Sequence, residues 1–514
     1  MISTRGKDEL RPRVLIPMGI LIALGISVMS IYQPQGILLG ILGILGLSAL
    51  LKLLTLSRKS WWVSWLGIVA VSAFGPFLDI VTHQPVNWLI GLMVLLLFAL
   101  LLAKPVLHQV VTHAAKISLR VRLPVLGFVF LLYTFYFLLQ ALRPGVEIWN
   151  GLLAFRTPLI GLGAYFLTMY GFYARMSRET FIDRLRQVLY VFVTVGMIVA
   201  AYGLFQFVVG FDRLQAWGLT EAGGLYFHHQ INLNEGAPIF RIFSTMRRNE
   251  VLGAFLYLNI VAGAAAFRLG LRPKWLTLTS LALSSIALLL TLSLTSLVTL
   301  GIWIGLLVFT SGSKRLVGRA LILGVLSVLV TFGINQLLGG LIWIRFEEHV
   351  LHTQEGRGRV QMFLNWIAET SERPLPQIMF GSGICTGVDE DTLARIGNVL
   401  STLGIRVGAL FECGWKREIH DNWYATHSLE IGWLGLLLLW LVFGLVPVYI
   451  LPHLRRRWKE PERGAWTVLA LGVLAVWPSG FVAALILYMP ITLYFWSIVA
   501  VLDAGAAPVL TEEA

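Results

Sequence analysis

The chain has 514 residues, of which 57% are hydrophobic and only 13% are charged, and its mean hydropathy is +0.78. A water-soluble fold carries about twice that share of charged residues, so the composition excludes soluble enzyme folds and indicates a membrane protein. Disorder is excluded as well, because the sequence contains 18 Trp and 29 Phe. The formal net charge of +13 would favour nucleic-acid binding in a soluble protein. Cytoplasmic loops of membrane proteins also collect Lys and Arg, so we expect no nucleic acid as a partner.

Apolar runs long enough to cross a bilayer recur along the whole chain. They lie at 14–31, 36–56, 61–80, 86–103, 122–142, 151–173, 187–210, 250–267, 275–291, 293–310, 318–338, 426–450, 465–483 and 485–502. Because these runs lack the alternation of a β-strand, they predict helices rather than a barrel. We therefore expect an all-α polytopic transmembrane helix bundle of about 14 spans, with about 12 as the lower bound.

The spacing of the runs divides the chain into three parts. An N-terminal transmembrane bundle of about 11 spans covers 1–338 and contains an external segment at 211–249. A large external loop with short amphipathic helices covers 339–425, and C-terminal transmembrane helices cover 426–514. The basic residues before residue 14 resemble the start of a signal peptide. No small-residue cleavage site follows, so we expect a retained first helix.

Most of the 40 Lys and Arg fall in alternate loops, which is the positive-inside pattern of membrane proteins. This pattern places both termini in the cytoplasm. The basic residues expected inside are Arg5, Lys7, Arg11, Arg13, Lys52, Arg58, Lys59, Lys104, Lys116, Arg120, Arg122, Arg175, Arg178, Arg184, Arg186, Arg268, Arg272, Lys274, Lys314, Arg315, Arg319, Arg455, Arg456, Arg457, Lys459 and Arg463.

The remaining basic residues lie on the external side, against the sorting rule, and charges at a membrane edge are usually functional. Most of them occupy 211–249 and 339–425. The second of these segments also contains the only two cysteines, Cys385 and Cys413. An oxidising exterior permits a disulfide between them, but two separate thiols fit the sequence equally well.

The first candidate motif runs from Arg241 to Gly253 and leads straight into a predicted span. Arg241, Arg247 and Arg248 form a compact cationic group at the external mouth of a helix. Arginine suits phosphate because its planar guanidinium donates parallel hydrogen bonds and stays charged. The alternative is that these residues only anchor the chain among lipid headgroups.

The second motif begins with Arg357 and Arg359 and continues through Trp366 to Pro374 and Gly381-Ser-Gly383. Arg359, Phe363, Trp366 and Ile367 share one helical face, which predicts an amphipathic helix on the outer surface of the membrane. Its leading Arg359 is a second candidate for phosphate binding. The alternative is an ordinary surface helix.

The third motif, from His420 to Gly435, enters the span at 426–450. A His beside an Asp at a wet membrane face can act as a general base, because His titrates near neutral pH and the carboxylate orients it. His420 and Asp421 fit these roles, and Glu430 follows on the same helix. His427 is the alternative base, or it makes a purely structural hydrogen bond.

A metal site is not expected. Glu347, Glu348, His349 and His352 have a suitable spacing, but no Cys or third convergent ligand lies nearby. The sequence also lacks a P-loop and a soluble nucleotide-sugar domain, so any donor substrate must arrive through the membrane.

At these motifs the chain resembles the superfamily of O-antigen ligases and O-antigen polymerases, bacterial membrane enzymes that transfer lipid-linked glycans. The similarity covers about 200 residues, 241–440, through the order of the motifs and the long external loop. Thr291-Leu-Ser293 is similar to a Thr-x-Ser-Arg motif of the family, with Leu294 in place of Arg. In the helix-entry motif, Asp421 occupies the usual position of the family's His, so the base is His420 or another residue.

The resemblance implies an inverting, metal-independent glycosyltransferase without a cofactor. Its donor is a glycan on undecaprenyl diphosphate, and its acceptor is a hydroxyl of another glycan or of a lipid core. The bacterial cytoplasmic membrane holds the enzyme, with the active site on the outer face and membrane lipid around it. Other polysaccharide-assembly proteins are its expected partners.

The resemblance also distributes roles among the residues of the three motifs. Catalysis falls to His420, Asp421 and Glu430, with His427 as the alternative base. Diphosphate binding falls to Arg241, Arg247, Arg248 and Arg359. Glycan binding falls to Asn422, Tyr424 and Trp366.

Two other functions remain open from the sequence. A polytopic transporter of a lipid-linked or anionic substrate would show inverted repeats and charges at mid-membrane, and neither is visible here. A pure scaffold would leave the external arginines without a role. The sequence does not separate a polymerase from a ligase.

Overall fold

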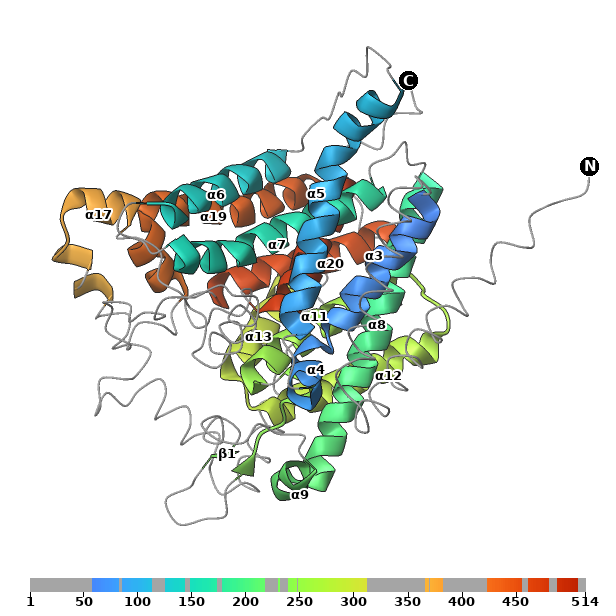
Figure 1. Cartoon of the computed structure of the whole chain (residues 1–514). Coiled ribbons are helices and arrows are strands. Elements are labelled where there is room, and N and C mark those ends of the chain that lie inside the picture. Colours follow the sequence, from blue (N-terminus) through green and yellow to red (C-terminus); the bar gives the residue numbers. More distant parts are fainter. Residues whose placement is uncertain are drawn as a thin grey trace, which may run out of the picture.

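Helices form nearly all of the described part of the chain (Figure 1). The structure is a computed structural model. It describes residues 58–82, 86–112, 125–143, 148–172, 178–217, 230–231, 239–246, 248–311, 366–368, 370–381, 423–454, 461–479 and 488–506. The two strands, β1 (Gln230–Ile231) and β2 (Ile239–Phe240), pair antiparallel ahead of the Arg241 segment. The prediction of an all-α bundle is therefore confirmed for the described residues, apart from this short pair.

Except for the short helices Phe211–Ala216 and Leu375–Phe380, the described helices fall where the apolar runs predict them. They are α3 (Arg58–Ser72), α4 (Gly75–Thr82), α5 (Val86–Thr112), α6 (Val125–Ala141), α7 (Ile148–Phe172), α8 (Arg178–Val209), α9 (Phe211–Ala216), α11 (Asn249–Arg268), α12 (Lys274–Thr291), α13 (Leu294–Ser311), α17 (Leu375–Phe380), α19 (Trp423–Leu454), α20 (Pro461–Ser479) and α21 (Met489–Ala506). The run at 61–80 forms two helices, because a turn at Ala73 and Phe74 separates α3 from α4. The runs at 14–31, 36–56 and 318–338 lie outside the described residues.

Four of the described helices are long and apolar enough to cross a membrane: Glu179–Val209, Asn249–Arg268, Lys274–Thr291 and His427–Val446. Shorter apolar helices occur at Val86–Ala99, Val125–Ala141, Leu294–Thr310 and Met489–Gly505. These helices indicate a membrane protein. The count of about 14 spans stays a prediction.

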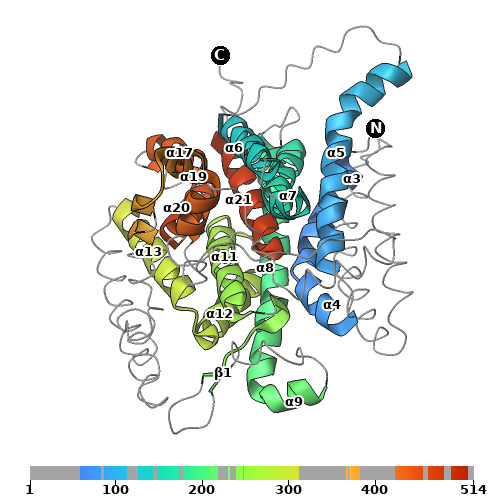
Figure 2. The ribbon, with the colours of Figure 1, turned by 60° about the vertical axis from the view of Figure 1, so that its left-hand side comes forward.

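Helix α11 lies at the centre of the C-terminal half of the bundle (Figure 2). It packs against α8, α12, α13, α20 and α21, and most of its residues are buried. Asn259 on α11 donates hydrogen bonds to Ser280 and Ser284 of α12, at 3.0 and 2.7 Å. Ser280 in turn donates to the Val193 carbonyl of α8 at 2.9 Å. Polar bridges of this kind hold helices together inside a membrane, where the hydrophobic effect between helices is weak.

One face of α6 carries large apolar side chains that are exposed. They are Phe128, Leu131, Leu132, Phe135, Leu139 and, just beyond the helix, Leu142. An apolar stripe of this length is unfavourable in water and favourable in lipid. We therefore interpret this face of α6 as lipid-facing.

Several helix ends that carry basic residues lie together. Trp62 near the start of α3 donates to Gln187 of α8 at 2.8 Å, and the Arg184 guanidinium stands 5.0 Å from the Trp62 ring centroid. Arg268 at the end of α11 lies against Gly464 at the start of α20, where an added Cβ would be 3.1 Å from the Arg268 Nε. These are the ends that the charge pattern assigns to one side of the membrane.

Candidate functional site

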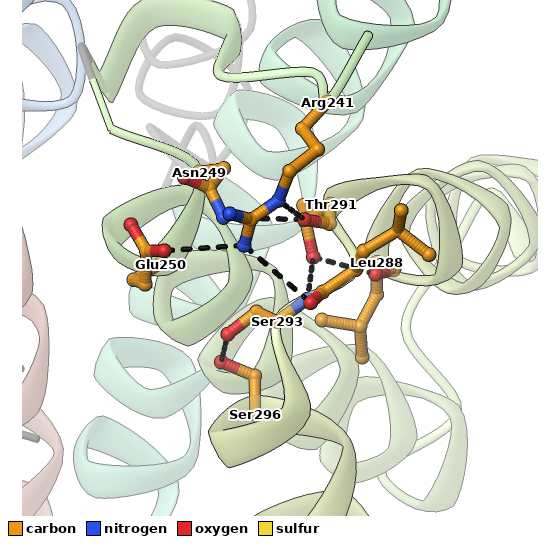
Figure 3. A network of polar contacts seen from close by, with 8 residues as sticks. Arg241, Asn249, Glu250, Leu288, Thr291, Ser293 and Ser296 are labelled. Carbon is orange, nitrogen blue, oxygen red and sulfur yellow. Dashed lines mark hydrogen bonds and ion pairs between the residues drawn. The ribbon is translucent and has the colours of Figure 1, made fainter. Parts of the chain in front are cut away.

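The Arg241 side chain is bound at the turn between α12 and α13 (Figure 3). Its Nε donates to the Thr291 carbonyl at 3.2 Å, and its Nη2 donates to Glu250 Oε1 at 3.1 Å and to the Leu292 carbonyl at 3.5 Å. Asn249 Nδ2 donates to the same Thr291 carbonyl at 3.3 Å. The first motif therefore meets the Thr-Leu-Ser motif, although fifty residues separate them along the chain.

The sequence of the turn explains why its carbonyls face Arg241. Leu292 ends α12 in the left-handed conformation, with φ 50° and ψ 31°. The Thr291 hydroxyl donates to the Leu288 carbonyl at 2.7 Å and accepts from the Ser293 amide at 3.2 Å, which fixes the turn. The last carbonyls of a helix have no partner within it and form the negative end of its dipole, so a guanidinium is favoured there.

Glu250 is the more accessible partner of this ion pair. The Arg241 side chain is 7% exposed, and that of Glu250 is 38% exposed. Burial lowers the pKa of Arg241 from its usual range, while the neighbouring Glu250 carboxylate raises it. Glu250 is therefore the side from which solvent reaches this ion pair.

The segment that follows Arg241 is held from two sides. The Gln206 side chain of α8 accepts from the Ser244 amide at 2.6 Å and donates to the Ser244 carbonyl at 3.2 Å. The Thr245 hydroxyl donates to the Ala73 carbonyl at 2.7 Å. Beyond it, Arg248 donates to the Tyr488 hydroxyl at 2.9 Å. These bonds fix Arg241 and Arg248 on a rigid frame.

A second cluster joins the external-loop motif to the helix-entry motif. Trp366 is buried and donates its indole N–H to the Ser428 hydroxyl at 2.8 Å. Its ring stacks on Trp433 with 5.8 Å between centroids. Ile367, the next residue, is exposed. The amphipathic helix on the membrane surface stays a prediction, because Arg359 and Phe363 lie outside the described residues. Trp366 packs on protein, and Ile367 points outward.

Two glycines form the tightest contact of this cluster. Gly432 interrupts α19 with φ 72° and ψ 176°, so the helix is kinked there. Gly381 ends α17 with φ 74° and ψ 175°, and an added Cβ on it would lie 2.6 Å from the Gly432 nitrogen. Only glycine adopts this backbone region without strain, and only glycine leaves room for the contact.

Side chains from α6 and from the turn after it form hydrogen bonds on both sides of the glycine pair. Arg143 Nη1 donates to the Gly381 carbonyl at 2.6 Å, and the Tyr136 hydroxyl donates to the Ile431 carbonyl at 2.8 Å. The kink at Gly432 therefore leaves the Ile431 carbonyl with a hydrogen-bond donor, the Tyr136 hydroxyl. The second and third motifs meet here as one unit.

His427 and Glu430 lie side by side within the same cluster. The Tyr133 hydroxyl and His427 Nε2 are 3.0 Å apart, and His427 Nδ1 is 3.8 Å from Glu430 Oε2. The two side chains are only 4% and 8% exposed. The structural hydrogen bond that the sequence allowed for His427 is therefore present, with Tyr133 as its partner. A base at this position would need an opening to reach a sugar hydroxyl.

Other predicted site residues fall outside the described part of the chain. They are His420, Asp421, Asn422, Arg247, Arg359, Cys385 and Cys413, together with the metal-like group at 347–352. The convergence of Arg359 with Arg241, the disulfide and the choice of His420 as base stay predictions. Tyr424 is described: it is fully buried, and its hydroxyl donates to the Trp477 carbonyl at 2.6 Å. Its contacts are those of a packing residue.

The sequence reasoning missed the residues that complete both clusters. Glu250 lies inside the first motif but received no role, although an acid nine residues from Arg241 is a natural ion partner. Tyr133 and Tyr136 come from α6, nearly 300 residues before their partners on α19, and Arg143, two residues after α6, lies 238 residues before Gly381. No local signal links these residues. Long-range pairings of this kind depend on the packing of the whole bundle.

No protein-family model matches the chain, and no curated protein matches its sequence. The described residues also contain no group of three or more His, Cys, Asp or Glu that could hold a metal ion. The motifs and their pairing in space are what support a function.

Proposed function

We propose that this protein is a membrane glycosyltransferase of the O-antigen ligase and polymerase type. The observation that carries the proposal is the pairing of its motifs. Arg241 binds the turn at Thr291–Ser293, and Trp366 and Gly381 bind Ser428 and Gly432. If the motifs matched the family by chance, nothing would require them to contact one another in space. Residues that serve one functional site have to lie together.

The proposed reaction transfers a glycan from undecaprenyl diphosphate to an acceptor hydroxyl with inversion. The acceptor oxygen attacks the anomeric carbon, and the bond from that carbon to the diphosphate oxygen breaks. The diphosphate leaves with the bonding electrons, and the acceptor proton passes to a base, which we assign to His420 with Asp421 and Glu430 in support. A positioned base contributes about 10²–10⁴ in rate.

Arginines stabilise the leaving diphosphate in this proposal. Preorganised cations act where charge develops in the transition state, and they need no metal ion for this. Arg241 already stands on a rigid frame with Glu250 at its accessible side, so the carboxylate holds the place of an incoming phosphate. Arg248 follows Arg241 closely in the sequence, and its side chain donates a hydrogen bond to the Tyr488 hydroxyl. Arg247 and Arg359 complete the set.

The proposal places the site on the outer face of the bacterial cytoplasmic membrane. It includes about 14 spans, both termini in the cytoplasm, the large loop 339–425 outside, and a glycan or lipid-core acceptor. Asn422 is assigned to the glycan side of the site, and the buried Tyr424 and Trp366 are assigned to packing beneath it. Other polysaccharide-assembly proteins are the proposed partners.

The test uses the purified full chain in vesicles with a lipid-linked oligosaccharide. Chain growth on this donor alone indicates a polymerase, and release that needs a second acceptor indicates a ligase. Arg213→Ala is the control for Arg241→Ala, because Arg213 on α9 is an exposed cation of the same external segment. No transfer to any lipid-linked or core acceptor, with the fold intact, would overturn the proposal.

A further inference from the structure

Helix α17 stands at one end of the bundle with none of its residues buried (Figure 1). It has six residues, and Leu375 is 70% exposed. An isolated helix of this length is not stable in water, since even sequences with high helix propensity need about 12 residues or more. The contact with α19 leaves Leu375, Pro376, Met379 and Phe380 exposed, so an environment that favours apolar side chains has to cover them.

The exposed side chains of α17 form one apolar stripe. Leu375 and Met379 are one helical turn apart, and so are Pro376 and Phe380, so the four side chains cover adjacent parts of one face. All four are exposed, whereas Ile378 on the side of the helix away from the stripe is half-buried. The stripe contains no charged residue.

The stripe continues the apolar face of α6 that we interpret as lipid-facing. Arg143, two residues after the end of α6, donates to the carbonyl of Gly381, directly after α17. Leu142 and Phe380 precede these two residues, and both are exposed. The apolar face of α6, from Phe128 to Leu142, therefore runs up to the stripe of α17. This continuity identifies hydrocarbon, rather than another protein, as the medium that covers the stripe.

We propose that α17 is a membrane anchor, whose stripe of Leu375, Pro376, Met379 and Phe380 inserts into the outer edge of the bilayer. A short helix with one apolar face lies in the interface rather than crossing it. Because Gly381 is locked against Gly432, this anchor fixes the kink of α19 relative to the lipid surface. The inference does not depend on the proposed reaction.

Quenching of a single fluorophore tests the anchor. Leu375→Cys and Met379→Cys are each made in a chain carrying Cys385→Ser and Cys413→Ser, labelled with NBD and reconstituted in phosphatidylethanolamine–phosphatidylglycerol vesicles. Phospholipids with a doxyl group on the acyl chain should reduce NBD fluorescence at both positions, and aqueous iodide should not. Phe135→Cys on the lipid-facing side of α6 is the positive reference, and exposed Ser371→Cys is the aqueous control.

Two outcomes would overturn the anchor. Quenching of positions 375 and 379 by iodide, as at position 371, would place the stripe in water. Protection from both quenchers would show that protein covers it, either a partner or a second copy. If the cysteine variants do not fold, the unmodified chain is irradiated in vesicles with a phospholipid carrying a diazirine on its acyl chain. Fragment mass spectrometry should then find label on residues 375–380, and label on α6 without label on 375–380 would also overturn the proposal.

Discussion

Arg241 combines deep burial with hydrogen bonds to one carboxylate and two helix-end carbonyls. The carbonyls attract its charge permanently, whereas Glu250 is partly open to solvent and can be exchanged. The residue is therefore suited to two tasks. It fixes the segment before α11 to the α12–α13 turn, and in the proposed function it contacts the diphosphate of the donor.

Replacement of Arg241 should reduce stability and donor binding more than replacement of an exposed arginine does. We expect Arg241→Ala to lower the free energy of unfolding by about 2 kcal/mol, because it removes the hydrogen bonds to the Thr291 and Leu292 carbonyls and leaves Asn249 as the donor to Thr291. The contribution of Glu250 is reduced by its exposure to solvent. The variant should also weaken binding of the lipid-linked donor. Thermal unfolding followed by Trp fluorescence and a donor-binding assay check both effects.

Arg213→Ala on α9 is the matched control and should stay within about 0.5 kcal/mol of the native chain. Equal stability and equal donor binding in the two variants would contradict both roles of Arg241. Loss of stability with unchanged donor binding would leave Arg241 as a positioning residue only.

The two histidines of the third motif should differ in kind. His420→Ala should reduce the transfer rate by about 10²-fold or more with donor binding nearly intact, because a base acts in the transition state. His427→Ala should instead reduce stability, and Tyr133→Phe should produce part of the same effect, because their side chains are hydrogen-bonded in the bundle. Transfer rates and unfolding temperatures of the three variants are the measurements.

Full activity of His420→Ala together with an inactive, folded His427→Ala would move the role of base to His427. Activity in both variants would contradict a histidine base. The acceptor would then lose its proton to Asp421, to Glu430 or to the leaving diphosphate.

At the scale of elements, the kink in α19 organises the second cluster. The apolar run at 426–450 predicts a continuous helix, and hydrophobic pattern alone does not reveal a break within such a run. The break depends on one backbone conformation at Gly432 and on the close approach of α17. The motif Glu430-x-Gly432 marks the position in the sequence, but its structural meaning appears only when Gly381 is placed beside it.

Gly432→Ala should destabilise the protein by about 3 kcal/mol or more, because it adds backbone strain and a clash with the end of α17. Gly444→Ala is the control within the same helix: no atom lies within 4 Å of the position of its Cβ. That substitution should be neutral or slightly stabilising, because Ala has the higher helix propensity by about 1 kcal/mol. The unfolding temperatures of the two variants are compared.

The double variant Gly381→Ala/Gly432→Ala adds a second check on the contact. Both changes disrupt one interface. The losses of unfolding free energy in the two single variants, added together, should therefore exceed the loss in the double variant. Additive effects, or a Gly432→Ala variant as stable as Gly444→Ala, would contradict the interlocked arrangement.

At the scale of the whole molecule, the start of α3 contacts α8, and the end of α11 contacts the start of α20. The side of the membrane on which these ends lie stays a prediction. Periodicity and length predicted the described helices because every span has to satisfy its own backbone in lipid. The same pattern did not predict which helices touch, since lipid-facing and protein-facing apolar residues look alike in a sequence. The position of α11 at the centre follows from small and polar residues such as Gly263 and Asn259, which allow close packing and cross-helix hydrogen bonds.

The α11–α12 pair gives the clearest measure of the distance between the two ends of the bundle. Asn249 and Thr291 meet at Arg241, and the opposite ends carry Arg268 and Lys274. At 1.5 Å per residue, the 18 residues of α12 extend about 27 Å, which is close to the thickness of the hydrocarbon core. If Arg241 is external, Lys274 has to be cytoplasmic.

Labelling of single cysteines should therefore give opposite results at the two ends. We expect a membrane-impermeant maleimide to label Asp212→Cys on α9 in intact cells, and to label Lys274→Cys only after permeabilisation. Both side chains are exposed, and both variants carry Cys385→Ser and Cys413→Ser, so accessibility depends only on the side of the membrane. The reverse pattern would place Arg241 on the cytoplasmic face and contradict an outer-face reaction. Labelling of both positions in intact cells would contradict a single orientation, and with it the use of loop charge to assign the sides of this bundle.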